Sequence, residues 1–344
     1  MSHLENEIHE QPHAAARLIE RERANVLAMA RSIRQFGPEY VVIAARGTSD
    51  NAARYAQYLI GHQIGWTVAL AAPSLHTLYK TPPNMARALV IGISQSGQSE
   101  DVRQVIDDAR AQGAMTVSIT NDAESPLAKL AGYHLPIHAE TEHAVAATKT
   151  YTTELIALAM LVAAIRDGAG YEGTLTGLPA AMLRALEQSA AIRDWANEYK
   201  DLSRYAVVGR GYNYCTAYEI SLKIKELCYV PGEEYSEADF RHGPIAIVKP
   251  GFPVIVVNPS GIPFAQLHDL LHKLKERGAD TLLITDSDGL GDLARHVLPI
   301  PTVEEWLSPI LAVIPGQIMA MHFAIARGNP VDAPVGLTKV TNTV

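Results

Sequence analysis

The sequence predicts an α/β protein of two tandem domains, each a parallel sheet with helices on both faces. Short apolar runs rich in β-branched residues end in Gly- or Ser-containing turns and alternate with segments of helical periodicity. The chain also matches itself in order at an offset of about 165 residues, as a duplicated unit does. At 344 residues it is long enough to bury the cores of two domains.

Four pairs of segments carry this internal match, and each pair occupies the same place in its half. They are 40–47 with 205–211, 91–97 with 255–261, 110–122 with 277–286, and 135–137 with 298–300. The organisation that follows is a lead-in over 1–24, a first domain over 25–170, a second domain over 195–330, and a C-terminal tail over 331–344.

In the first half, the strand expected over 88–93 leads into a hydroxyl-rich turn and then into a helix that starts at Glu100. The turn supplies Ser94, Gln95, Ser96 and Ser99. A helix N-terminus presents unpaired N–H groups and the positive end of the helix dipole, so an anion there accepts hydrogen bonds from the loop and the hydroxyls. We interpret the turn as a phosphate site, and the alternative is a serine-capped turn without a ligand.

A second strand end in this half adds hydroxyl groups to the same rim of the predicted sheet. Thr48 and Ser49 follow Arg46 at the end of the strand over 40–45. Arg46 is either a phosphate ligand or a structural residue, because Arg210 holds the same place in the other half. Both interpretations stay open from the sequence.

The second copy of the serine turn differs where a phosphate would bind. Its residues are Asn258, Pro259, Ser260, Gly261, Ile262 and Pro263. Two prolines remove N–H donors, and fewer hydroxyls are present. The sequence therefore predicts that only the first half holds a phosphate.

The second half carries a candidate acid–base set. The helix expected over 217–227 places Glu219, Lys223 and Glu226 on one face at spacings of four and three. An exposed ion-pair ladder is the alternative interpretation. The loop over 233–244 contains four carboxylates and ends in His242 before a Gly-Pro turn, a place where an acid–base group is held rigidly.

Charge, cysteine content and apolar patterning argue against several classes of protein. A formal charge of −8 without a Lys/Arg cluster argues against a nucleic-acid partner. Only Cys215 and Cys228 are present, and the N-terminus lacks the pattern of a signal peptide, so we expect a cytoplasmic protein. No apolar run is expected to span a membrane, no histidine pairing predicts a metal, and no cofactor is predicted.

Taken together, these residues resemble the sugar-isomerase (SIS) domain family, and within it the isomerase half of glucosamine-6-phosphate synthases. The motifs occur in order over nearly the whole chain. They are Gly47-Thr48-Ser49, Ser94-Gln95-Ser96-Gly97, Ala146-Ala147-Thr148-Lys149, Leu222-Lys223-Ile224-Lys225-Glu226, His242-Gly243-Pro244 and Leu337-Thr338-Lys339. The resemblance implies two flavodoxin-like SIS subdomains.

The resemblance also implies a role for each matching residue. The residues Thr48, Ser49, Ser94, Gln95, Ser96, Ser99, Val145 and Ala147 would bind a hexose or hexosamine 6-phosphate. Glu226 would move a proton between C1 and C2, Lys223 would assist at a hydroxyl, and His242 would open the sugar ring from the neighbouring subunit of a homodimer. Lys339 would form a Schiff base with a ketose phosphate.

The chain differs from the synthases at several positions, and these differences decide which reaction we expect. The 344 residues include no glutaminase domain and no N-terminal cysteine, so we expect no glutamine-dependent reaction from this chain alone. Pro231, Ala147 and Val335-Gly336 replace site residues of the synthases. We expect an aminosugar-phosphate deaminase that converts glucosamine 6-phosphate to fructose 6-phosphate and ammonia. A fructosamine-6-phosphate deglycase, a galactosamine-type deaminase and an ammonia-dependent synthase are enzyme alternatives, and a phosphosugar sensor is the non-catalytic one.

Overall fold

The computed structural model describes residues 1–339, and in these the chain forms two compact units. Unit 1 comprises Met1–His9, His143–Ala146 and Ala180–Leu337. Unit 2 comprises Glu10–Glu142, Ala147–Pro179 and, at the end of the described chain, Thr338 and Lys339.

Unit 2 is built on a five-stranded parallel sheet in the order β2-β1-β3-β4-β5. The strands are β1 (Tyr40–Ala44), β2 (Val68–Leu70), β3 (Ala88–Ile93), β4 (Met115–Thr120) and β5 (Tyr133–Pro136). The helices that begin in this half of the chain are α1 (His3–Arg21), α2 (Arg23–Phe36), α3 (Gly47–Ile64), α4 (Ser74–Thr77), α5 (Glu100–Ala111), α6 (Pro126–Leu130), α7 (Lys149–Asp167), α8 (Glu172–Leu175) and α9 (Leu178–Leu186).

Both faces of this sheet are covered, because every residue of β3 and β4 is buried. On one face Val90 packs into a cluster with Val102, Val105 and Ile106 of α5. On the other face α7 packs against α2 and α3, and 17 of its 19 residues are buried. From Leu155 to Ile165 the helix is apolar on all sides, because no side of it meets water there.

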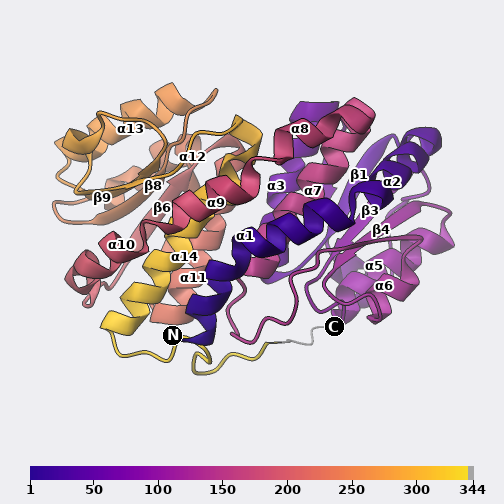
Figure 1. Ribbon diagram of the computed structural model, residues 1–344, viewed down its shortest axis with the longest axis horizontal. Coiled ribbons are helices and arrows are strands. Elements are labelled where there is room, and N and C mark those ends of the chain that lie inside the picture. The colour runs from indigo at the N-terminus through magenta and orange to yellow at the C-terminus, as the bar shows by residue number, and fades with distance from the viewer. Residues whose placement is uncertain (340–344) are drawn as a thin grey trace. The chain divides into compact units, whose positions relative to one another are not determined.

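Unit 1 repeats this architecture with the sheet order β10-β9-β8-β6-β7. Its strands are β6 (Tyr205–Gly209), β7 (Gly232–Ser236), β8 (Pro253–Val257), β9 (Asp280–Thr285) and β10 (His296–Pro299). Its helices are α10 (Ser189–Ala196), α11 (Tyr214–Cys228), α12 (Glu237–Arg241), α13 (Phe264–Glu276) and α14 (Ser308–Ala326). In both sheets the first strand of the half lies between the second and the third. Figure 1 labels β6, β8 and β9 of this unit beside α12 and α13. The predicted α/β class with two repeated subdomains is confirmed.

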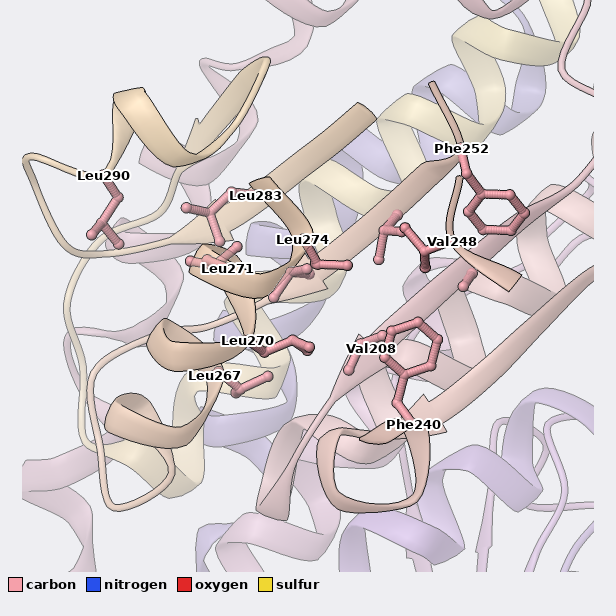
Figure 2. Close-up of a cluster of buried hydrophobic side chains, with 13 residues drawn as sticks. Val208, Phe240, Val248, Phe252, Leu267, Leu270, Leu271, Leu274, Leu283 and Leu290 are labelled. Atoms are coloured by element: carbon pink, nitrogen blue, oxygen red, sulfur yellow. The ribbon is translucent and has the colours of Figure 1, made fainter. Parts of the chain in front are cut away.

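The core on one face of this second sheet is filled by aliphatic and aromatic side chains (Figure 2). Leu267, Leu270, Leu271 and Leu274 lie on the buried side of α13, at the spacing of three and four expected for a helix that covers a sheet. Phe240 of α12 fills the same cluster beside Val208 of β6. The apolar periodicity of 264–276 therefore becomes a packed face.

The last helix corrects one expectation from the sequence. Glu305–Ala326 is long and apolar enough to cross a membrane by length and composition, although no such run was expected. In the structure 89% of its most apolar window is buried, and α14 packs against α10 and α11. The helix is apolar on all sides because it is a core helix of unit 1.

Candidate functional site

The hydroxyl-rich turn lies at the topological switch point of the sheet in unit 2, where the order in which the chain adds strands reverses. β1 and β3 are neighbours, with Ala44 opposite Gly92, yet the chain leaves β1 toward β2 and leaves β3 toward β4. The two connections diverge from the carboxyl ends of these strands, where parallel sheets form ligand sites. Thr48 in the first turn of α3 and Ser94 directly after β3 both belong to this edge.

The serine hydroxyls of the turn are not used to cap the following helix. Ser99 is the N-cap of α5, but its side chain accepts no hydrogen bond from the helix backbone. Its Oγ lies 3.2 Å from Oγ of Ser94, and Oγ of Ser96 accepts from the N–H of Gln98 at 3.2 Å. Ser94 is buried, whereas Gln95, Ser96 and Ser99 are partly exposed. The turn therefore brings hydroxyl groups together at a helix N-terminus, and none of them caps the helix by accepting from its backbone.

Gly97 sets the shape of this turn. Its φ of +63° lies in the left-handed region, and a Cβ there would come within 2.2 Å of Oγ of Ser125. Ser125 caps α6 through the N–H of Ala128, and the carbonyl of Gly97 accepts from the N–H of Leu127. The turn and the start of α6 are thus packed against one another, and only glycine fits between them.

Gly97→Ala is expected to destabilise the protein by about 1–3 kcal/mol for the backbone strain and by a comparable amount for the clash with Ser125. Gly113→Ala is the matched control, because Gly113 has a φ of +80° and no atom within 4 Å of its Cβ position. Urea unfolding of both variants measures the difference. Equal losses in the two variants would show that the contact with Ser125 costs nothing.

The equivalent turn in unit 1 has its donors occupied by side chains of the protein. Asp286 accepts from the N–H of Ser260 at 2.6 Å and from its hydroxyl, and Glu305 accepts from the N–H of Ile262 at 2.8 Å. A Cβ on Gly261 would meet the carboxyl group of Glu305 at 2.5 Å. Two internal carboxylates thus take hydrogen bonds that an anionic ligand would need, which supports a phosphate site in the first half alone.

The two strand-end arginines behave alike. Nε of Arg46 donates to Asp101 at 2.5 Å, and the Asp101 side chain is 1% exposed. Arg210 pairs in the same way with Glu237, which is also buried. Since each arginine neutralises a buried carboxylate at the start of a helix, the structural interpretation of both residues is favoured.

Ser49 and Thr48 differ in what surrounds them. The Ser49 side chain is buried and donates to Oε1 of Glu154, a buried residue of α7, at 2.8 Å. Thr48 is partly exposed. Ser49 therefore joins α3 to α7, and Thr48 is the better placed of the two for a ligand.

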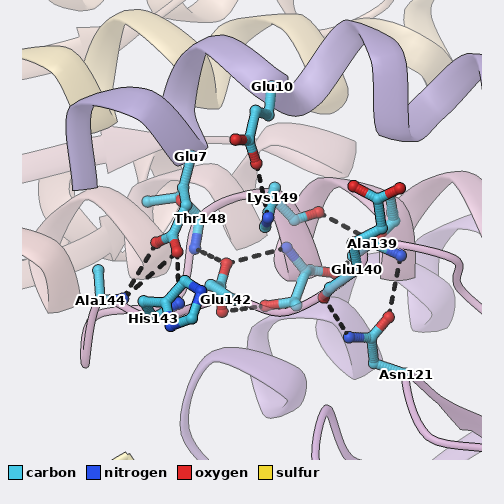
Figure 3. Close-up of polar contacts among 12 residues, drawn as sticks. Glu7, Glu10, Asn121, Ala139, Glu140, Glu142, His143, Ala144, Thr148 and Lys149 are labelled. Atoms are coloured by element: carbon cyan, nitrogen blue, oxygen red, sulfur yellow. Dashed lines mark hydrogen bonds and ion pairs between the residues drawn. The ribbon is translucent and has the colours of Figure 1, made fainter. Parts of the chain in front are cut away.

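Lys339 of the C-terminal tail is paired with a buried carboxylate. Its Nζ donates to Oε2 of Glu142 at 2.6 Å, and the Glu142 side chain is wholly buried. Oε1 of Glu142 accepts from the N–H of Thr148 at 2.9 Å and of Thr150 at 3.1 Å (Figure 3). Ala147 adjoins this helix start and is partly exposed. The predicted imine lysine is thus held at the N-terminus of α7.

Val145 lies in a segment of unit 1 whose backbone is fixed by hydrogen bonds that involve Asp332 and Glu7. Its N–H donates to the carbonyl of Asp332 at 2.9 Å, and the Asp332 side chain accepts from the N–H of Leu4 at 2.8 Å. Glu7 of α1 accepts from the N–H groups of His143 and Ala144 (Figure 3). Three segments that are far apart in the sequence are therefore tied together around Val145.

The candidate acid–base set on α11 is buried. The Lys223 side chain is 1% exposed, and its Nζ lies 2.5 Å from Oε2 of Glu226 and 3.5 Å from Oε1 of Glu219. The Glu219 side chain has no exposed surface, and that of Glu226 retains 23%. An exposed ladder of ion pairs is excluded by this burial. A lysine between two carboxylates can hold charge and exchange protons in a site from which most water is removed.

His242 ends α12, where its N–H donates to the carbonyl of Asp239 at 3.1 Å. The residue is exposed, and the following Gly243 adopts a φ of +136°. Of the loop carboxylates, Glu237 is held by Arg210 and Arg241, and Asp239 accepts from the Ser236 hydroxyl. These acidic residues therefore shape the loop around His242.

A hollow of about 350 Å³ in unit 1 lies away from this set. It is lined by residues at the amino-terminal ends of the strands, among them Arg204 before β6, Pro253 of β8 and Asp280 of β9. Ligands of parallel sheets bind at the opposite edge. Within residues 1–339 no group of three His, Cys, Asp or Glu side chains could hold a metal ion.

The structure groups the predicted residues by unit. Unit 2 contains Thr48, Ser49, Ser94, Gln95, Ser96, Ser99, Ala147 and Lys339, and unit 1 contains Val145, Lys223, Glu226 and His242. Reasoning from the sequence overlooked Glu142, whose segment has no periodicity, and gave Glu219 no role. The pairing of Glu142 with Lys339 spans 197 residues, so no local signal could have revealed it.

Comparisons with known proteins find relatives that match nearly the whole chain. The family model of the SIS domain matches residues 38–164 and 198–327. A glutamine–fructose-6-phosphate aminotransferase (isomerizing) of Thermococcus kodakarensis is 33% identical over 343 residues, which are 97% of this chain and 56% of that protein. The corresponding protein of Gloeobacter violaceus is 36% identical over 313 residues, with 88% and 51% covered. The chain thus spans about half the length of these curated relatives.

Solved structures show the same similarity. The C-terminal domain of glucosamine-fructose-6-phosphate aminotransferase from Francisella tularensis superposes with a TM-score of 0.89 at 26% identity, covering 97% of this chain and 98% of that one. Glucosamine-6-phosphate deaminase from Thermotoga maritima gives 0.80 at 24% identity, covering 99% and 100%. The second likeness is one of fold.

Proposed function

This chain belongs to the SIS domain family, and from that premise we propose that it is an aminosugar-phosphate deaminase and isomerase. Its substrate would be glucosamine 6-phosphate or a related hexosamine 6-phosphate, and its products fructose 6-phosphate and ammonia. The observation that carries the proposal is the burial of Lys223 between Glu219 and Glu226. A hydroxyl-rich phosphate turn would serve a sensor equally well, whereas a buried acid–base set serves catalysis.

The reaction divides into proton transfers that these side chains can perform. His242 would move the proton that opens the pyranose ring, which exposes an aldehyde at C1. Glu226 would remove the proton from C2 and return it to C1, which converts the amino aldehyde into an imine at C2. Water would then add to this imine, release ammonia and leave the ketone of fructose 6-phosphate. Lys223 would stabilise the negative charge that develops on the C1 oxygen.

The phosphate would bind at the turn after β3. Ser94, Ser96 and Ser99 present hydroxyls beside the N-terminus of α5, where the helix dipole favours an anion. Thr48 and Gln95 would add donors at the same edge of the sheet.

The proposal includes a homodimer, in which the exposed His242 would serve the neighbouring subunit. It also includes a cytoplasmic location.

The proposal is tested by incubating the purified protein with a panel of hexosamine 6-phosphates and measuring ammonia release and product mass. Exchange of solvent deuterium into C1 of fructose 6-phosphate separates an enzyme from a sensor, because binding alone exchanges no carbon-bound proton. A fructosamine-6-phosphate deglycase, a galactosamine-type deaminase or an ammonia-dependent synthase would be identified by its products. Binding without exchange or ammonia release would contradict the proposal and favour the sensor.

The double substitution Ser94→Ala and Ser96→Ala is expected to weaken binding of fructose 6-phosphate by about 10²- to 10⁴-fold, because hydrogen bonds to a charged phosphate contribute about 1.5–3 kcal/mol each. Ser260→Ala is the matched control, since its hydroxyl is already donated to Asp286 in the equivalent turn. Isothermal titration calorimetry measures the affinities. Equal weakening by both changes would place the phosphate elsewhere.

A further inference from the structure

We propose that Glu142 is the proton acceptor of Lys339, taking the ammonium proton when the lysine attacks the sugar and returning it when water leaves. This inference deepens the proposed function, because it requires Lys339 to form an imine with the ketose phosphate.

The contact geometry places Glu142 directly on the reacting atom. Its Oε2 accepts from Nζ of Lys339 at 2.6 Å and from Oγ1 of Thr150 at 2.7 Å. Its Oε1 accepts from two backbone N–H groups at the start of α7. The carboxylate is therefore wholly buried and accepts four hydrogen bonds, while the lysine side chain remains 25% exposed.

Glu142 is a carboxylate at neutral pH. Burial by itself would raise the pKa of Glu142, but the Lys339 charge and the donors from Thr148 and Thr150 outweigh it and hold the pKa below its ordinary value. The dipole of α7 acts in the same direction. The charged carboxylate lies 2.6 Å from Nζ of Lys339, so an ammonium proton can pass to it without the help of solvent.

Other charged groups near this segment have partners of their own. Lys149 at the start of α7 pairs with Glu10 of α1 at 2.6 Å (Figure 3). Glu140 lies 3.3 Å from Arg17 of the same helix. His143, the next titratable residue along the chain, packs its ring against His3 with centroids 5.1 Å apart. The charge of Lys339 is thus matched by Glu142.

The proton balance of imine formation fits this pair. Glu142 takes one proton from the ammonium group, and the neutral amine of Lys339 adds to C2, either to the ketone or to the imine that carries the substrate nitrogen. Glu142 then gives the proton back to the departing group, which leaves as water or ammonia. The product is a protonated lysine imine and a carboxylate, so no other acid or base is consumed.

The test is the pH dependence of trapping. Native protein and variants are mixed with fructose 6-phosphate and sodium cyanoborohydride between about pH 6 and 8, and the adduct is counted by intact mass. In Glu142→Gln the lysine must lose its proton to solvent, so the ratio of its trapping rate to the native rate should rise with pH. Glu142→Asp keeps a carboxylate, and its ratio should stay constant with pH.

Glu10→Gln is the matched control, because it removes a carboxylate that is paired with a different lysine of unit 2, and its ratio should stay at one. A ratio for Glu142→Gln that does not change with pH overturns the inference. If that variant does not fold, a pH-dependent ratio for Glu142→Asp overturns it instead. A native protein that releases ammonia but is never trapped refutes the role of Glu142 alone, whereas one that does neither refutes the proposed function as well.

Discussion

Glu226→Gln is expected to lower the rate of ammonia release by about 10²–10⁴-fold, the usual contribution of a general base. Glutamine keeps the shape of the side chain but cannot accept the C2 proton. Affinity for fructose 6-phosphate should remain within a few-fold of native, because the predicted phosphate contacts come from the turn over 94–99. Steady-state kinetics measures the rate, and calorimetry measures the affinity.

Glu234→Gln is the matched control for this substitution. Glu234 of β7 also pairs with a lysine of α11, since Nζ of Lys225 lies 2.7 Å from its Oε2. Loss of that carboxylate should leave the rate of ammonia release nearly native. A Glu226→Gln protein that retains full activity would remove Glu226 from the mechanism, and equal losses in both variants would point to damage of the helix.

Lys223→Met is expected to destabilise the protein by about 3–5 kcal/mol, because it leaves the buried carboxylate of Glu219 without the nearby positive charge of Lys223. Methionine fills most of the space of the lysine stem, so the loss reports charge rather than a cavity. The free energy of unfolding in urea measures the effect. Ammonia release should be lost as well.

Two further variants separate charge from packing. Lys225→Met removes a lysine of the same helix whose side chain is 37% exposed, and its cost should be at most about 1 kcal/mol. Adding Glu219→Gln to Lys223→Met should recover much of the lost stability, because the buried negative charge of Glu219 disappears. A cost for Lys223→Met no greater than that for Lys225→Met would show that the buried lysine contributes no pairing energy.

The two halves share one architecture but differ in the turn after the third strand. The turn over 94–99 is the proposed phosphate site, whereas the donors of the turn over 258–263 are bonded to carboxylates of the protein. Both sheets have the same strand order, and both place a Ser-Gly turn after the third strand of the half. In unit 2 the serine hydroxyls face one another beside a helix start. In unit 1 Asp286 and Glu305 supply the negative charges from within the protein. A carboxylate and a phosphate make similar demands on a set of N–H and O–H donors.

Much of the fold could be predicted from the sequence, because strand and helix periodicities are local properties. The buried runs at Ala88–Ile93 and Pro253–Val257 became the central strands β3 and β8, and the internal match corresponds to two sheets of identical order. The long apolar helix α14 was not predicted from the sequence. Its burial depends on helices α10 and α11, which no local pattern in the sequence indicates.

The sequence by itself determined the fold class, the alternation of strands and helices and the turn in which serine hydroxyls meet a helix start, since each depends on neighbours within about ten residues along the chain. Only the tertiary structure decided that Lys223 is buried between carboxylates rather than exposed on a ladder, because burial depends on the helices that pack against α11. It also decided that Lys339 meets Glu142. Pairing across 197 residues is a property of the folded chain, and no spacing in the sequence encodes it.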